Sequence, residues 1–175
     1  MRLSLEIPHH SVYNRNIVGI FPCLTRCYTI TYERNTMRTL ALSDEILMKV
    51  DKAARYIGGE VNSVMKDKNN VDIRFAMCFP DVYEIGMSNL GMMILYNMFN
   101  EREDVWAERV FSPWLDLDKI MREKNIPLFA LESQEPVKDF DFLGITLGYE
   151  MCYTNVLQVL DLSHISLLAK DREED

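Results

Sequence analysis

The feature that most constrains the fold is a strand–loop–helix pattern over residues 71–98. Apolar side chains alternate over residues 71–79 with the period of a β-strand, and Pro80 ends the alternation. Ser88 is a candidate N-cap for a following helix. Its apolar positions recur at helical spacing: Leu90, Ile94 and Met98. Because ligands of open α/β sheets lie at the carboxyl ends of strands, we expect the chain to be organised around the intervening loop.

Strand and helix patterns continue to alternate after this unit and also precede it. The expected elements are a helix over 43–57 capped by Ser43, a strand over 107–111, a short helix capped by Asp116 and closed by Asn125, a strand from 126 to 133, a strand over 140–147, a helix over 154–164 and a last strand over 165–170. The run 140–147 is almost continuously apolar, which is typical of a central strand buried on both faces. The alternation predicts an α/β, Rossmann-like, mostly parallel sheet with helices on both faces. Right-handed crossovers would place the loops 80–88, 132–139 and 148–153 at one edge.

Composition excludes several classes of protein. No apolar run reaches the ~20 residues that a membrane-spanning helix needs, so we expect no membrane partner. The net charge of −8 does not favour general nucleic-acid binding. Four scattered cysteines do not make a disulfide scaffold, and a reducing, cytoplasmic location suits them best.

Residues 1–36 differ from the rest of the chain. They carry a net charge of +2 (four arginines against two glutamates), which leaves −10 for residues 37–175. We expect Met37 to be the natural start, with residues 1–36 as a disordered extension or an artefact of gene calling. The alternative is a short β arm that packs on the domain.

Isolated motifs predict little chemistry. Cys23 and Cys27 form C-x3-C, but the third cysteine of a cluster-binding triplet is missing, and we interpret both thiols as incidental. Cys78 and Cys152 have no neighbouring histidine in the sequence and are interpreted as small buried hydrophobes. The histidines are not spaced as metal ligands, and there is no glycine-rich phosphate loop. We therefore predict no catalytic residue and no metal ligand.

One short motif stands apart. Asp81-x-Tyr83-x-x-Gly86 has the frame of D-x-H-x-x-G, the signature of cobalamin domains in which the histidine ligates cobalt from below. Tyr83 replaces that histidine, so the ligation would be lost. On its own, the motif is explained better by a loop capped by Asp81 and Ser88.

Several blocks of sequence, in continuous order, resemble a single family. They are ARYIGGEVNSV (54–64), FPDVYEIGMSNLG (79–91), ERVFSPW (108–114), PLFALES (127–133) and YEMCYTNVLQVLDL (149–162). Together they resemble the N-terminal domain of the cobalamin-binding-type radical SAM proteins of bacteria. The resemblance covers about residues 37–175, and residues 1–36 have no counterpart.

This resemblance implies a cobalamin-binding-like domain followed by a radical SAM barrel, present in cis in the full-length protein or in trans. That barrel holds a 4Fe–4S cluster on a C-x3-C-x2-C motif and binds S-adenosylmethionine. The chain ends before both a glycine-rich segment and the cysteine triplet. We therefore expect a domain truncated at its C-terminus and inactive alone, and its status as an enzyme stays open.

The resemblance also implies a cobalamin site at the sheet edge. Its expected residues are Asp81, Tyr83, Glu84, Gly86, Ser88 and Asn89, with Tyr149, Glu150 and Thr154 opposite. Each has a structural alternative, such as a cap for Asp81, Ser88 or Thr154, packing for Tyr83, and solvated surface for Glu150.

The alternative function is a non-catalytic protein-interaction module that binds no cofactor. Its contact surface would include a methionine stripe, although a stripe at helical spacing is more often core: Met87, Met92, Met93 and Met98. An open cavity beside residues 81–88 would favour cobalamin, whereas a flat apolar patch would favour docking. We also expect exposed apolar surface near residues 165–175 and some tendency to associate.

Overall fold

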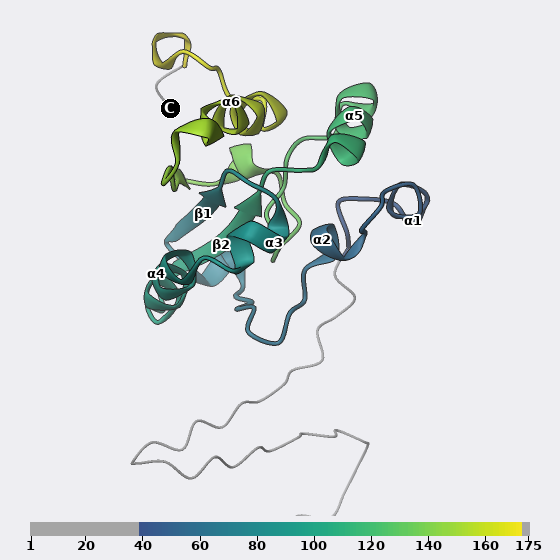
Figure 1. Ribbon diagram of the computed structural model, residues 1–175. Coiled ribbons are helices and arrows are strands. Elements are labelled where there is room, and N and C mark those ends of the chain that lie inside the picture. The colour runs from purple at the N-terminus through teal and green to yellow at the C-terminus, as the bar shows by residue number, and fades with distance from the viewer. Residues whose placement is uncertain (1–38, 173–175) are drawn as a thin grey trace, which may run out of the picture. The chain divides into compact units, whose positions relative to one another are not determined.

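A three-stranded parallel β-sheet lies at the centre of the computed structural model, which describes residues 39–172 (Figure 1). β1 (Ile73–Phe79) is the middle strand, with β2 (Val105–Phe111) on one side and β3 (Phe142–Ile145) on the other. Both neighbours run parallel to β1. The predicted α/β, Rossmann-like fold is confirmed, while the predictions for residues 1–36 lie outside the described residues.

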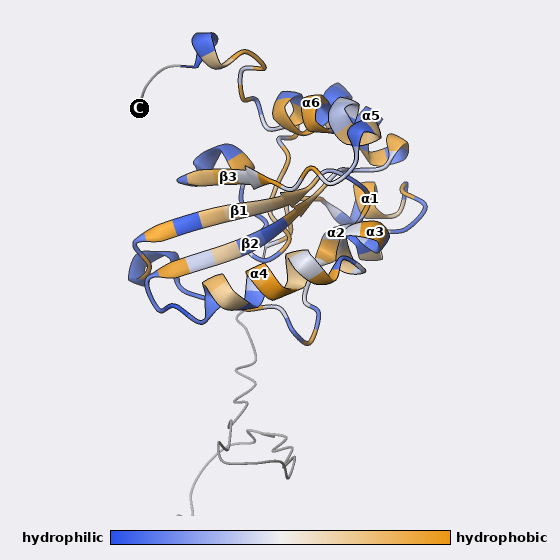
Figure 2. Ribbon diagram, turned by 60° about the vertical axis from the view of Figure 1, so that its left-hand side comes forward, coloured by the Kyte–Doolittle hydropathy of each residue, from blue (hydrophilic) through white to orange (hydrophobic). Residues whose placement is uncertain are grey.

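Helices cover both faces of this sheet. The described α-helices are α1 (Asp44–Leu47), α2 (Ala54–Ile57), α3 (Tyr83–Met87), α4 (Leu90–Asn100), α5 (Leu115–Lys124) and α6 (Tyr153–Leu162). The 3-10 helices are η1 (Lys68–Asn70), η2 (Val137–Asp139), η3 (Glu150–Cys152) and η4 (Ala169–Asp171). α4 lies on one face of the sheet, and α5 and α6 lie on the other (Figure 2). Among the described residues, no helix is long and apolar enough to cross a membrane.

Alternation along the strands sends successive side chains into two separate apolar cores. Ala76 and Cys78 of β1 belong to one core, and Met77 of β1 and Ala107 of β2 belong to the other. On the first face, α5 and α6 complete the core with Leu117, Met121, Val159 and Leu162. On the second face, α4 completes the core with Met92 and Tyr96. Both faces are thus filled by packing, which leaves the strand ends as the places where a ligand could bind.

The burial of the strands differs from the prediction. Residues 140–147 do not form a central strand, because β1 takes that place and β3 lies at the edge of the sheet. Phe142 of β3 is 59% exposed. β2, in contrast, is buried at every position. No described strand pairs with the outer edge of β3, and this explains its exposure.

The strand predicted over residues 126–133 is also not formed, although the segment is mostly buried against β2. Leu131 donates its N–H to the carbonyl of Arg109, as in a sheet. The next bonds, however, use carboxylates: Glu132 accepts from the N–H of Arg109 at 2.7 Å, and Glu108 accepts from the N–H of Ser133 at 2.8 Å. Side chains therefore replace part of a β ladder.

The prediction that the loop 132–139 shares the edge of the other two loops is wrong. The segment before it runs antiparallel to β2, so this loop reaches the amino ends of the strands. Glu135 pairs there with Lys68 at 2.7 Å and also with Arg74, near the start of β1.

The helix predicted over residues 43–57 is broken into α1 and α2. Asp51, between them, donates its N–H to Asp116 of α5 at 2.8 Å, which draws the chain away from a helical path. α5 itself begins one residue before Asp116, so Asp116 is not its cap. Asn125 closes the helix as expected, and the structure shows it in the left-handed conformation (φ 53°).

The end of the described chain carries no strand. Residues 165–168 are irregular and lead into η4, so the predicted last strand over residues 165–170 is wrong. Leu167 and Leu168 are 47% and 55% exposed, which confirms the expected apolar surface in this region.

Candidate functional site

The carboxyl ends of the three strands meet at one edge and are joined by hydrogen bonds. The N–H of Ser112, after β2, donates to the carbonyl of Asp81 at 3.0 Å. The amide of Asn155 in α6 donates to the carbonyl of Pro80 at 2.9 Å. The Ser112 hydroxyl lies 2.6 Å from the side-chain oxygen of Gln158, also in α6. The loops after β1 and β3 thus share this edge, as the sequence predicted.

The Asp81–Gly86 motif forms the start of this edge, and internal contacts engage its side chains. Asp81 accepts the N–H of Val82 at 2.7 Å. Tyr83 is half-buried and donates its hydroxyl to Glu60 at 2.7 Å. Burial and the hydrogen bond to Glu60 raise the pKa of Tyr83 to about 12, so the phenol stays protonated at neutral pH. The structure therefore shows Tyr83 in the packing role that was the alternative to a cobalamin contact.

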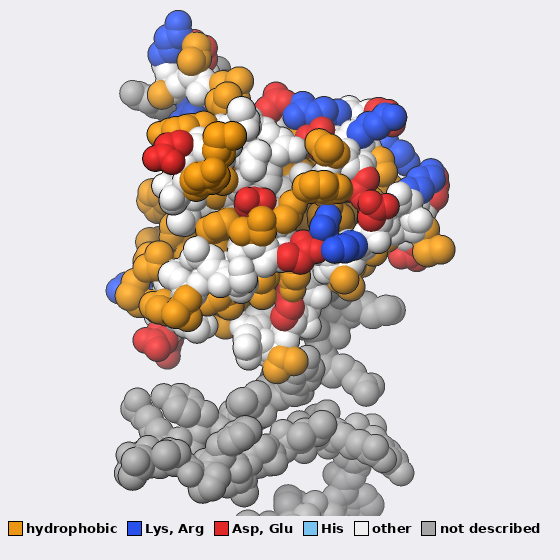
Figure 3. Space-filling view, viewed as in Figure 1, with side chains coloured by type: hydrophobic (Ala, Val, Ile, Leu, Met, Phe, Trp, Pro, Cys, Tyr) orange, Lys and Arg blue, Asp and Glu red, His pale blue; other side chains and the backbone are white. Residues whose placement is uncertain are grey.

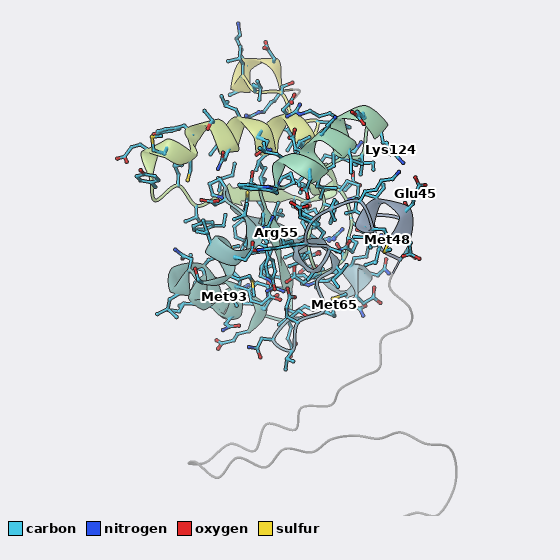
Figure 4. All side chains as sticks on the ribbon, turned by 45° about the vertical axis from the view of Figure 1, so that its right-hand side comes forward. Glu45, Met48, Arg55, Met65, Met93 and Lys124 are labelled. Carbon is cyan, nitrogen blue, oxygen red and sulfur yellow. The ribbon has the colours of Figure 1, made fainter. Side chains whose placement is uncertain are left out.

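Glu84 is exposed and forms ion pairs rather than facing a cavity. Its carboxylate lies 2.9 Å from Arg55 and 3.0 Å from Lys52 (Figure 4 labels Arg55). The hydrogen bond from Arg55 holds the pKa of Glu84 at about 2. Gly86 is buried, and a Cβ there would lie 2.2 Å from the Phe111 ring. These two residues thus connect α3 to α2 and to β2.

The cap of α4 is Asn89 and not Ser88. The Asn89 side chain accepts the N–H of Met92 at 2.9 Å, which is the N-cap bond. The Ser88 hydroxyl instead donates to the carbonyl of Ile85 at 2.8 Å and is exposed.

Removal of this cap provides a test. We expect Asn89→Ala to lower the free energy of unfolding by about 1 kcal/mol, because one N–H of the first turn loses its acceptor. Ser88→Ala is the control and should change it by less than about 0.5 kcal/mol, as surface substitutions do. Urea denaturation of both variants measures the difference, and equal losses would contradict the assignment of the cap.

The three residues expected opposite the loop lie on the open surface. Tyr149 is 61% exposed, and Glu150 and Thr154 are also exposed. Thr154 is the second residue of α6 and not its cap. The structure therefore brings these residues to the predicted edge, but none of the three lines the cavity beside α3 that is described below.

A buried ionic cluster behind the edge was not predicted from the sequence. Arg109 is 1% exposed and donates to Glu132 at 2.5 Å and to Glu60 at 2.8 Å. Its guanidinium also lies over the Tyr96 ring, 5.1 Å from the centroid. Through Glu60, the cluster reaches the hydroxyl of Tyr83. The motif tyrosine is thus one end of a chain of contacts that begins in the core.

A second buried cluster lies on the opposite face of β2. Arg74 donates to Glu108 at 2.6 Å and stacks over Phe140 at 4.1 Å. Glu108 is fully buried, and it carries the link to Ser133 described above. A hydrophobic pattern could not find either cluster, because a charged residue in a strand normally predicts an exposed position.

The enclosed space at this edge is small. A cavity beside α3 is lined by residues that include Tyr56, Tyr83, Arg109, Phe111 and Ser112. Its volume of about 20 Å³ is room for about one water molecule. No group of three histidine, cysteine or acidic residues within residues 39–172 could hold a metal ion.

The predicted buried position is confirmed for Cys78 and is wrong for Cys152. Cys78 is buried in β1, and burial raises its pKa to about 12. Cys152 is half-buried in η3. Cys23 and Cys27 lie outside the described residues.

Comparison with known protein families gives a match over the second half of the chain. Residues 91–175 match the family model described as "Radical SAM proteins, N-terminal". The match includes most of α4, and β2, β3 and α6, and it supports a radical SAM N-terminal domain in this part of the chain. No curated protein and no solved structure matches the chain.

Proposed function

We propose that this chain is the N-terminal docking domain of a radical SAM protein, and that its carboxyl edge beside α6 contacts the radical SAM core. The observation that carries the proposal is the exposure of three large side chains at this edge. Tyr149, Met151 and Tyr153 are 61%, 71% and 59% exposed. All three lie within the part of the chain that matches radical SAM N-terminal regions.

These side chains belong to one short stretch around η3 and the start of α6. Leu157, one turn after Tyr153, is 50% exposed and extends the surface along α6. Figure 3 shows hydrophobic side chains gathered in the region where α6 lies in Figure 1. Apolar and aromatic residues that cluster on a surface mark contact sites, and tyrosine and methionine are enriched at interfaces.

The cluster chemistry in this proposal belongs to the core and not to this chain. A 4Fe–4S cluster held by three thiolates would supply electrons for the cleavage of S-adenosylmethionine. The sequence contains C-x3-C at Cys23 but no C-x3-C-x2-C. We therefore expect no cleavage of S-adenosylmethionine by this polypeptide alone.

Cobalamin binding is the second candidate function. The loops after β1 and β3 converge at the edge where the Asp81 motif predicts a cobalamin site. The residues present do not enclose such a group. The cavity beside α3 holds about one water molecule, and the Tyr83 hydroxyl is already bonded to Glu60. A corrin would have to lie on the open surface between α3 and Tyr149.

The docking proposal is tested by binding to a radical SAM core. The probe is a purified core that carries C-x3-C-x2-C, taken from a protein whose N-terminal region matches the same family model. We expect Met151→Glu to weaken binding at least about tenfold, since a carboxylate would be desolvated at the contact. Met48→Glu is the matched control, because Met48 is 87% exposed at the end of α1, away from this edge (Figure 4).

Two outcomes would contradict docking at this edge. One is an equal loss of affinity for both variants, and the other is the absence of any binding to the core. If the core does not bind, and the absorption bands of cobalamin shift when it is titrated with the chain, the second candidate replaces the first.

A further inference from the structure

α4 is unusual among the long helices of the described chain because it is apolar on both sides. Its sequence, LGMMILYNMFN, contains no charged residue. α5, of similar length, contains six in LDLDKIMREK. Met92 and Tyr96 of α4 face the sheet and are buried. A helix that is hydrophobic all round is normally buried on all sides. We therefore expect another surface to cover the outer side of α4.

The outer side of α4 carries a straight ridge of large side chains. Leu90, Ile94 and Met98 are spaced four residues apart and are 72%, 56% and 50% exposed. Leu95 lies beside the ridge and is 40% exposed. Figure 3 shows hydrophobic side chains over the region where α4 lies in Figure 1. Ridges of residues four apart are the surfaces by which helices pack against each other.

We propose that this ridge binds a second copy of the same chain, with α4 packed antiparallel against α4 of the partner across a twofold axis. The ridge is self-complementary under reversal, which a twofold interface requires. With the axis at Ile94, each Leu90 meets the partner's Met98, and Ile94 meets its own counterpart. The side chains in both pairings have similar volumes.

Charge also favours a second copy at this surface. Two chains with a net charge of −8 repel each other, and a helix without charge lets them meet with the least repulsion. α4 has no acidic residue in its first turn and no basic residue in its last turn, so neither end of its dipole is compensated within the helix. Antiparallel packing places the exposed Glu101, at the C-cap, beside the positive end of the partner's helix.

This inference does not depend on the proposed function, because the ridge and the α6 edge are different surfaces.

Sedimentation equilibrium of the full chain tests the proposal. We expect a reversible dimer, and Leu90→Glu should raise its dissociation constant at least about tenfold by placing a carboxylate in the apolar contact. Leu115→Glu is the matched control, because Leu115 is also 72% exposed and is also the first residue of a helix. A chain that stays monomeric, or a dimer that Leu115→Glu weakens equally, would overturn the proposal.

Substitutions of opposite charge at the twofold axis distinguish a variant that has lost the dimer contact from a variant that has failed to fold. Ile94→Glu and Ile94→Lys should each be monomeric, because like charges meet across the axis. A mixture of the two should form a heterodimer. Failure of the mixture to associate, with both variants folded by circular dichroism, would contradict the twofold packing at Ile94.

Discussion

Arg109→Leu is expected to lower the free energy of unfolding by about 3–5 kcal/mol, the loss typical of removing one partner from a buried ion pair. Arg109 is 1% exposed and Glu132 is fully buried, so the substitution would leave a carboxylate without its cation in the core. Urea denaturation followed by circular dichroism measures the loss.

The control is Arg102→Leu, which removes an arginine that also forms an ion pair, at 2.6 Å. That pair, with Asp104, is on the surface, where Arg102 is 62% exposed, and such pairs contribute less than about 1 kcal/mol. The double variant Arg109→Leu/Glu132→Leu should recover part of the loss, because the fully buried carboxylate is removed and only the partly exposed Glu60 loses its cation. Equal losses for Arg109→Leu and Arg102→Leu would show that the buried cluster contributes no more to the free energy of unfolding than a surface ion pair.

Gly86→Ala is expected to cost about 1–3 kcal/mol, the usual cost of overpacking a close contact. The added Cβ would lie 2.2 Å from the Cε1 atom and 2.5 Å from the Cδ1 atom of Phe111. The Phe111 ring is buried and meets the Tyr83 ring edge-on at 5.5 Å, which limits its freedom to move. The glycine of the D-x-Y-x-x-G motif is therefore explained by the approach of α3 to β2.

Gly148→Ala is the control for this substitution. Nothing lies within 4 Å of a Cβ at Gly148, so the loss there should be small or absent. Thermal unfolding of both variants distinguishes the cases. A Gly86→Ala variant as stable as the wild type would mean that Phe111 moves freely, and the structural account of the motif would be wrong.

The sequence predicted those parts of the fold whose side chains repeat with a clear period. β1 and α4 were predicted because alternation and helical spacing are strong over residues 73–79 and 90–100. The strand over 126–133 failed because Glu108 and Glu132 supply bonds that the backbone would otherwise make. No local pattern reports such long-range side-chain bonds. The order of the strands was also inaccessible, so β3 was placed at the centre and not at the edge.

The predicted site residues were found at one edge, but the sequence did not predict what surrounds them. Tyr83 and Glu84 lie where the loop was expected, yet Glu60 and Arg55 engage them from a segment more than twenty residues earlier. The residues that matter most to this arrangement, Arg109 and Glu60, have no local signal of their own. Their roles follow only from the tertiary structure.

Hydrogen exchange of the full chain, with and without the purified radical SAM core, shows whether the edge formed by η3 and the start of α6 is the docking surface. With the core bound, we expect slower exchange over residues 149–157, where Tyr149, Met151 and Tyr153 are exposed in the free chain. We expect no change over α5, which carries charged residues on its surface. Protection confined to elements other than η3 and α6 would contradict docking at this edge.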